Sequence, residues 1–120
     1  MDELKKMNFQ LAHVGINCNS SDEAKETASA ICTLFGLDLI EAAPSFFAGT
    51  AVECMKQGGY GHNGHIGFST DDMPLAMSYL ASKGYEFIEE SKKLNPDGSV
   101  KLIYLKNEIA GFAIHLVAKE

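Results

Sequence analysis

Hydrophobic and polar residues alternate along several short stretches of this chain, which is the pattern of strands with one buried face. Residues 64–70 show it most clearly, because Ile66 and Phe68 fall on one face while His65 and Gly67 fall on the other. A histidine on the face opposite the apolar residues is unusual in such a strand. It marks this segment as a candidate for function.

The same pattern predicts the remaining elements. Ser20 and the acids after it favour a helix start, Gly36 and Gly84 favour helix ends, and residues 95–98 favour a turn. Residues 1–8 are predicted to be a polar lead-in. The predicted helices span residues 20–35 and 71–83, and the predicted strands span residues 9–18, 37–42, 45–48, 50–56, 64–70, 85–90, 100–105 and 112–118.

Both halves of the chain have the order strand, helix, strand, strand, strand, which indicates an internal duplication of a βαβββ unit. The His-Val-Gly-Ile run that begins at His13 is echoed by the His-Ile-Gly-Phe run that begins at His65. The segment between the halves is glycine-rich but lacks P-loop spacing, so it is predicted to be a linker. We therefore predict an α+β fold of two tandem modules. The boundaries are a single domain over 1–120, module one at about 8–57, the linker at 58–64 and module two at about 65–118.

Four side chains able to bind a metal occupy equivalent places in the two modules. His13 and His65 lie in the first strand of each module, and Glu53 and His115 lie in the last. All four fall on the face opposite the apolar residues, so a curled sheet would bring them to one cavity. Three imidazoles and one carboxylate suit a divalent ion such as Zn, Ni, Co, Fe or Mn, and their spacing does not select among these.

Each of these residues has an ordinary structural interpretation when it is taken alone. A single strand histidine is more often a hydrogen-bonded structural residue, and Glu53 alone is more often solvated. Four residues able to bind a metal, at repeat-equivalent positions, together favour the metal site. His62, in the linker, is predicted to be a surface residue, with a substrate contact as the alternative. Phe46 and Phe47 are predicted to belong to the core and the cavity wall.

Composition narrows the classes of partner. The 120 residues carry a formal net charge of −6, and their basic residues are scattered lysines, which argues against a nucleic-acid partner. The three widely spaced cysteines indicate neither a disulfide framework nor a CxxC metal site. No apolar run approaches the roughly 20 residues of a membrane helix, and none follows the charged N-terminal residues. We expect a cytoplasmic protein without a membrane or nucleic-acid partner.

From about residue 9 to residue 118, the chain resembles the vicinal oxygen chelate superfamily, which includes glyoxalase I, extradiol dioxygenases and fosfomycin-resistance proteins. The resemblance implies a curved mixed sheet with helices on its convex face. In the glyoxalase I branch, a strand-one His, a strand-four Glu, a strand-five His and a strand-eight Glu bind the metal. His13, Glu53, His65 and His115 fall on those places, and the last departs from the pattern because His replaces Glu. Glu53 is then the one carboxylate left to act as catalytic base.

Longer runs, such as residues 47–53 and 102–117, are similar to one subgroup of the superfamily. It comprises glyoxalase-like domains associated with bacterial 2-dehydro-3-deoxyphosphogluconate (KDPG)/4-hydroxy-2-oxoglutarate aldolases. The resemblance implies a metal-dependent lyase or isomerase that acts on a small 2-oxo or hydroxy acid through a metal-chelated enolate, with a link to KDPG and 2-oxo acid metabolism. The alternative is a non-catalytic metabolite- or metal-binding module of the same fold. A homodimer is also expected.

Overall fold

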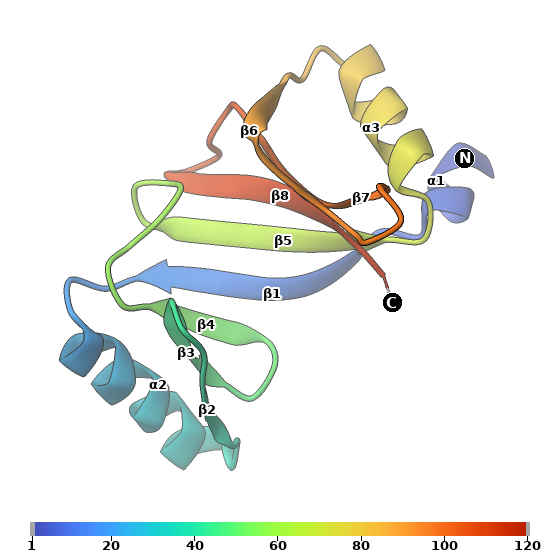
Figure 1. The fold of residues 1–120 in the computed structure, drawn as a ribbon. Helices are drawn as coiled ribbons and strands as arrows, with labels where there is room; N and C mark the ends of the chain where they lie inside the picture. The colour runs from blue at the N-terminus through green and yellow to red at the C-terminus, as the bar shows by residue number, and fades with distance from the viewer. Residues whose placement is uncertain (1, 120) are drawn as a thin grey trace.

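The computed structural model describes residues 2–119 as one continuous curved sheet of eight strands with three helices beside it (Figure 1). The strands lie in the order β2-β3-β4-β1-β5-β8-β7-β6. The elements are α1 (Asp2–Met7), β1 (Gln10–Asn17), α2 (Ser21–Phe35), β2 (Leu39–Glu41), β3 (Ser45–Ala48), β4 (Val52–Met55), β5 (Gly64–Thr70), α3 (Met73–Ser82), β6 (Phe87–Leu94), β7 (Val100–Leu105) and β8 (Phe112–Ala118).

The sheet order shows two copies of the same unit joined edge to edge. In the first copy β1 pairs in parallel with β4, and in the second copy β5 pairs in parallel with β8. The copies meet where β1 pairs antiparallel with β5, with Gly15 opposite His65 and His13 opposite Gly67. The four central strands are therefore β4, β1, β5 and β8. The predicted α+β class and the curved mixed sheet of two βαβββ units are confirmed.

The helices cover the sheet face opposite the predicted ligands. The core under α2 contains Cys54 of β4, the neighbour of Glu53, and the core that includes α3 contains Leu116 of β8, the neighbour of His115. Neighbouring strand residues point to opposite faces, so Glu53 and His115 point away from the helices. In Figure 1, α2 packs beside β2 to β4 and α3 lies at the other end of the sheet.

The helix signals in the sequence act as expected. The hydroxyl of Ser20 accepts a hydrogen bond from the Glu23 N–H at the start of α2, and Gly36 ends that helix with a left-handed φ of 67°. The Asp72 carboxylate caps α3 in the same way by accepting from the Leu75 N–H at 3.0 Å. Within residues 2–119, none of the helices has the length and apolar character needed to span a bilayer.

The N-terminal segment differs from its prediction as a polar lead-in. Asp2–Met7 form the short helix α1, and Met7 is 0% exposed among residues of α3 and the sheet. Among residues 4–7 of this helix, whose burial the structure describes, Met7 alone is buried, and one such residue gives no periodicity to detect. A tertiary contact holds the end of α1 in place instead. The Met7 carbonyl accepts a hydrogen bond from the Thr70 hydroxyl of β5 at 2.7 Å.

Candidate metal centre

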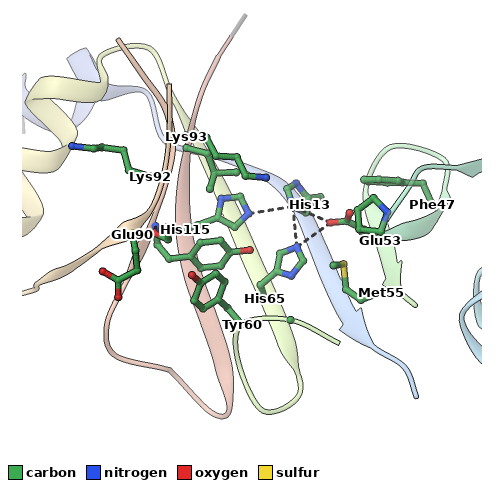
Figure 2. A pocket seen from close by; sticks show the side chains of 15 residues that line it. His13, Phe47, Glu53, Met55, Tyr60, His65, Glu90, Lys92, Lys93 and His115 are labelled. Atoms are coloured by element: carbon green, nitrogen blue, oxygen red, sulfur yellow. Dashed lines mark hydrogen bonds and ion pairs between the residues drawn. The ribbon is translucent and has the colours of Figure 1, made fainter. Parts of the chain in front are cut away.

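The four predicted ligands come from the four central strands and line one cavity of about 480 Å³ (Figure 2). His13 lies in β1, Glu53 in β4, His65 in β5 and His115 in β8. The structure therefore brings all four together within a single chain. The predicted homodimer is not needed to assemble this cluster.

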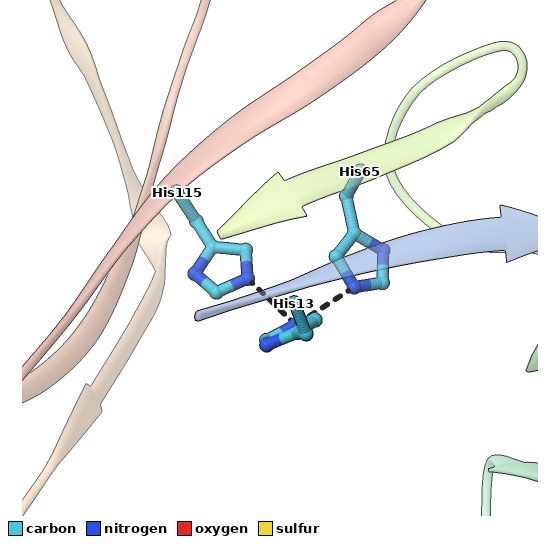
Figure 3. Close-up of side chains that lie close together, drawn as sticks. All are labelled: His13, His65 and His115. Atoms are coloured by element: carbon cyan, nitrogen blue, oxygen red, sulfur yellow. Dashed lines mark hydrogen bonds between the residues drawn. The ribbon is translucent and has the colours of Figure 1, made fainter. Parts of the chain in front are cut away.

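The donor atoms of the four side chains face one another. The Nε2 atom of His13 lies 3.1 Å from Nε2 of His65 and 3.2 Å from Nε2 of His115 (Figure 3). The Oε1 atom of Glu53 lies 3.1 Å from Nε2 of His65 and 3.7 Å from Nε2 of His13. One small volume is thus bounded by three imidazole nitrogens and one carboxylate oxygen.

These separations fit a bound divalent ion. Zinc held tetrahedrally at 2.0–2.1 Å from nitrogen and oxygen places its donors about 3.3 Å apart, close to the distances found here. Hydrogen bonds alone explain the cluster poorly, because Nε2 of His13 faces two other imidazole nitrogens and a neutral ring nitrogen can donate only one hydrogen. His13, His65 and His115 together form a candidate metal-binding group, with all the donor atoms within 4.8 Å of one another.

Two glycines make room for the imidazole rings. Gly15 is opposite His65, and a Cβ atom on Gly15 would overlap the His65 ring. A Cβ atom on Gly67 would lie 2.5 Å from Cε1 of His115 and 3.0 Å from Cε1 of His13. The His-x-Gly pattern shared by the two modules thus places each histidine above a glycine of the adjacent strand.

Replacing Gly67 with alanine is expected to weaken metal binding about 10- to 100-fold, because the new methyl group displaces the rings of His115 and His13. Competition with a chromophoric chelator measures the affinity. Gly59→Ala is the matched control, since its Cβ atom would meet only Cε of Met55 at 3.7 Å. Equal metal affinities of the two variants would contradict the role given to Gly67.

Burial keeps two of the imidazoles neutral. Burial and the neighbouring charges of His13 and His65 lower the pKa of His115 from 6.5 to about 4, although its backbone hydrogen bond and Glu53 oppose the shift. The pKa of His13 is also lowered, chiefly by burial and next by the charge of His65, while Glu53 opposes the shift. Neutral imidazole is the form that binds metal. His13 and His115 therefore do not have to release a proton when they bind a metal at neutral pH.

Glu53 is fixed by a residue that the sequence did not single out. The hydroxyl of Ser45, itself 0% exposed, donates to Oε2 of Glu53 at 2.7 Å and leaves Oε1 facing the histidines. Burial acts to raise the pKa of Glu53, but hydrogen bonds from His65 and Ser45 and the nearby histidine charges outweigh it and hold that pKa below its usual value. Glu53 is therefore ionised at neutral pH.

Aromatic residues form much of the cavity wall. The ring of Tyr104 lies 4.8 Å from the ring of His115 and 4.4 Å from the ring of Tyr60, between centroids. Burial, and then the charges of Glu53 and Tyr60, raises the pKa of Tyr104 to about 12. Phe47 lines the opposite side, as predicted, while Phe46 is buried in the core. The sequence prediction missed both tyrosines, because Tyr104 lies in a strand whose place beside the cavity depends on the sheet order, and Tyr60 lies in the glycine-rich segment between the modules.

His62 lies outside the cluster. Its Nδ1 atom is 2.7 Å from Oε1 of Glu108, and its side chain is 85% exposed. The hydrogen bond and charge of Glu108 raise the pKa of His62, as a solvent-facing ion pair does. The prediction of a surface residue is confirmed.

No family model and no curated protein matches this chain. Solved structures do resemble it. A hypothetical protein from Bacillus halodurans C-125 has a TM-score of 0.64 and 16% identity, covering 93% of this chain and 95% of that chain. Methylmalonyl-CoA epimerase from Streptomyces coelicolor, in complex with 2-nitronate-propionyl-CoA, has a TM-score of 0.62 and 16% identity, covering 92% and 96%. The Mycobacterium tuberculosis epimerase has a TM-score of 0.59 and 17% identity, covering 92% and 87%.

At identities of this size, the structural similarity shows the fold alone. The chain therefore has the glyoxalase-like fold that the sequence resemblance implied, over nearly the whole length of the proteins it matches. The two named enzymes are epimerases, and the link to KDPG aldolases stays a prediction from the sequence.

Proposed function

We propose that this chain is a metal-dependent isomerase that moves a proton on the carbon next to a carbonyl group of a small oxo or hydroxy acid. The observation that carries the proposal is the convergence of three imidazole nitrogens and the Glu53 carboxylate in one open cavity, with neighbouring donors 3.1 to 3.7 Å apart. The likeness to epimerase structures supports an isomerase over other reaction classes.

Each ligand role follows from the position of the side chain. His13, His65 and His115 would hold the ion, and Glu53 would be the fourth donor. When bound, a divalent ion supplies a Lewis acid that stabilises negative charge on two adjacent substrate oxygens. Gly15 and Gly67 lie beneath the imidazole rings, and contacts between strands hold the rings in place. The donor atoms are therefore positioned before a ligand binds.

Glu53 is the group best placed to move the proton. Its Oε1 atom faces the cavity beside His65, while Ser45 holds its other oxygen. An ionised carboxylate can accept a proton from a carbon acid through the oxygen that faces the cavity and can return that proton to carbon. The surrounding wall of Phe47 and Tyr104 excludes part of the solvent from that exchange.

One observation favours the alternative of a non-catalytic binding module. The donor cluster contains one carboxylate, because His115 occupies the place of the second carboxylate in the glyoxalase I pattern. Glu90 also lines the cavity, but its side chain points away from the histidines in Figure 2. A metabolite could then be bound and sensed without proton transfer. Lyase chemistry on a 2-oxo acid is tested by the same experiment, because cleavage leaves an enolate that takes up a proton at carbon three, and the reverse reaction removes a proton from that carbon.

The test is hydrogen–deuterium exchange at carbon three of 2-oxo acids, followed by proton NMR in deuterated water. For one or more acids, we expect the exchange rate with the metal-loaded protein to be at least 100-fold higher than the rate with the metal-free protein or with free metal. Binding of an acid to the loaded protein without any exchange across the panel would support the binding module instead.

A further inference from the structure

Strand β6 borders the cavity over four consecutive residues that the metal cluster does not use. Glu90, Ser91, Lys92 and Lys93 all line the cavity. The sequence prediction ended this strand at residue 90, whereas β6 continues to Leu94. The extension brings two lysines to a cavity in a chain whose formal net charge is −6.

A buried serine sets the direction of these side chains. Ser91 is 7% exposed; its hydroxyl donates to the Ile88 carbonyl at 2.6 Å and accepts from the Tyr104 N–H at 2.9 Å. The pairing of β6 with β7 is irregular here, with a register shift between Ile88 and Lys93. Such a bulge redirects the side chains around it. Ser91 therefore fixes both the Tyr104 wall and the course of β6 past the cavity.

The charged side chains of this segment differ in direction. In Figure 2 the ammonium group of Lys93 extends toward the side of the cavity that holds His13, while Lys92 and Glu90 point away from the histidines. Lys92 lies 3.5 Å from Glu89, whereas Lys93 has no carboxylate within ion-pair distance among the side chains of residues 4–119. Among these described side chains, Lys93 is thus a cation without an ion-pair partner at the mouth of the cavity.

The metal-loaded donor cluster is a second source of positive charge in the cavity, beside Lys93. A divalent ion with three neutral imidazoles and one carboxylate carries a net charge of about +1, because only Glu53 offsets the metal. The two-carboxylate set of the glyoxalase I pattern would be neutral. A cavity with positive charge at its base and at its mouth favours ligands with an anionic group at each end.

We propose that the ligand of this cavity is a dianion, whose adjacent oxygens meet the donor cluster and whose second anionic group, a carboxylate or a phosphate, pairs with Lys93. The proposal rests on the proposed function, because the first group requires the loaded metal site. It adds the substrate class and names Lys93 as a binding residue. The tyrosines and Phe47 line the space between the two ends.

Calorimetric titrations of the metal-loaded protein with three probes test binding at each end of the ligand separately. Oxalate offers only adjacent oxygens, 2-oxoglutarate adds a distal carboxylate, and 3-phosphoglycerate adds a distal phosphate. Lys93→Met removes the charge and keeps the apolar stem. We expect this variant to bind oxalate within twofold of wild type and to lose about tenfold in affinity for 2-oxoglutarate, for 3-phosphoglycerate or for both. The larger loss identifies the distal group.

Lys92→Met is the matched control, and its affinities are expected to stay within twofold of wild type for all three probes. Lys93→Arg, which keeps the charge, should restore most of the lost affinity. Equal loss for oxalate and the longer acids, or no loss for either longer acid, would overturn the assignment of Lys93 and leave the proposed function intact. Failure of oxalate and both longer acids to bind the loaded wild type would reject both proposals.

Discussion

Replacing Glu53 with glutamine is expected to lower metal-dependent exchange of 2-oxo acid protons about 1,000-fold, within the range that a positioned general base contributes. Glutamine keeps the shape of the side chain and can still accept the Ser45 hydroxyl bond, but it cannot take up a proton at neutral pH. The three histidines remain to hold the ion at saturating metal. The exchange rate by NMR, measured beside bound metal, separates the loss of the base from the loss of the ion.

Glu90→Gln is the control for this experiment. Glu90 lines the same cavity but points away from the histidines, so its exchange rate should stay close to that of wild type (Figure 2). An unchanged rate in Glu53→Gln, or equal losses in the two variants, would show that Glu53 is not the base. A metal-bound water would then be the next candidate for proton transfer.

Metal binding is expected to raise the midpoint of thermal unfolding by about 10 °C at metal concentrations 100-fold above Kd. Ligand binding at that excess adds about 2.7 kcal/mol to the unfolding free energy, and each kcal/mol shifts the midpoint of a domain of this size by about 4 °C. His115→Ala removes one of four donors, so its midpoint should not respond to the same concentration of Ni, Zn, Co or Mn. Differential scanning calorimetry measures both shifts.

His62→Ala is the control for the thermal experiment, because His62 is exposed and paired with Glu108 outside the cluster. Its midpoint should rise with metal as in wild type. The His115→Ala protein is also expected to be less stable without metal, since a side chain that is 1% exposed leaves a cavity. The metal-dependent shift is therefore the decisive quantity, and a wild-type shift in His115→Ala would remove His115 from the ligand set.

The alternation of apolar and polar residues predicted where the strands lie and which residues share a face of the sheet. Residues 64–70, 100–105 and 112–118 were predicted as strands and form β5, β7 and β8 with the same bounds. This success has a physical reason, since side chains in a strand must alternate between two faces. The repeat then placed His13 and His65 at equivalent positions, and the sheet brings them together where β1 meets β5.

The residues that support the site could not be read from the sequence. Ser45, Ser91 and Tyr104 act through contacts between strands, and each looks like an ordinary polar or aromatic strand residue. The bulge at Ser91 depends on a hydrogen bond to another strand, which no local pattern encodes. Gly67 is the exception. The repeat shows Gly67 and Gly15 at equivalent places two residues after His65 and His13, although the histidine that each glycine faces is known only from the strand register.

The central claim is that His13, Glu53, His65 and His115 form one metal site. X-ray absorption, together with metal analysis of protein purified without a His tag, tests it most directly. We predict one divalent ion per chain, with first-shell scattering at 2.0 to 2.2 Å from nitrogen and oxygen and the outer-shell pattern of three imidazoles. Less than one-tenth equivalent of metal after incubation with each candidate ion, or an ion bound with one imidazole or none, would contradict the account.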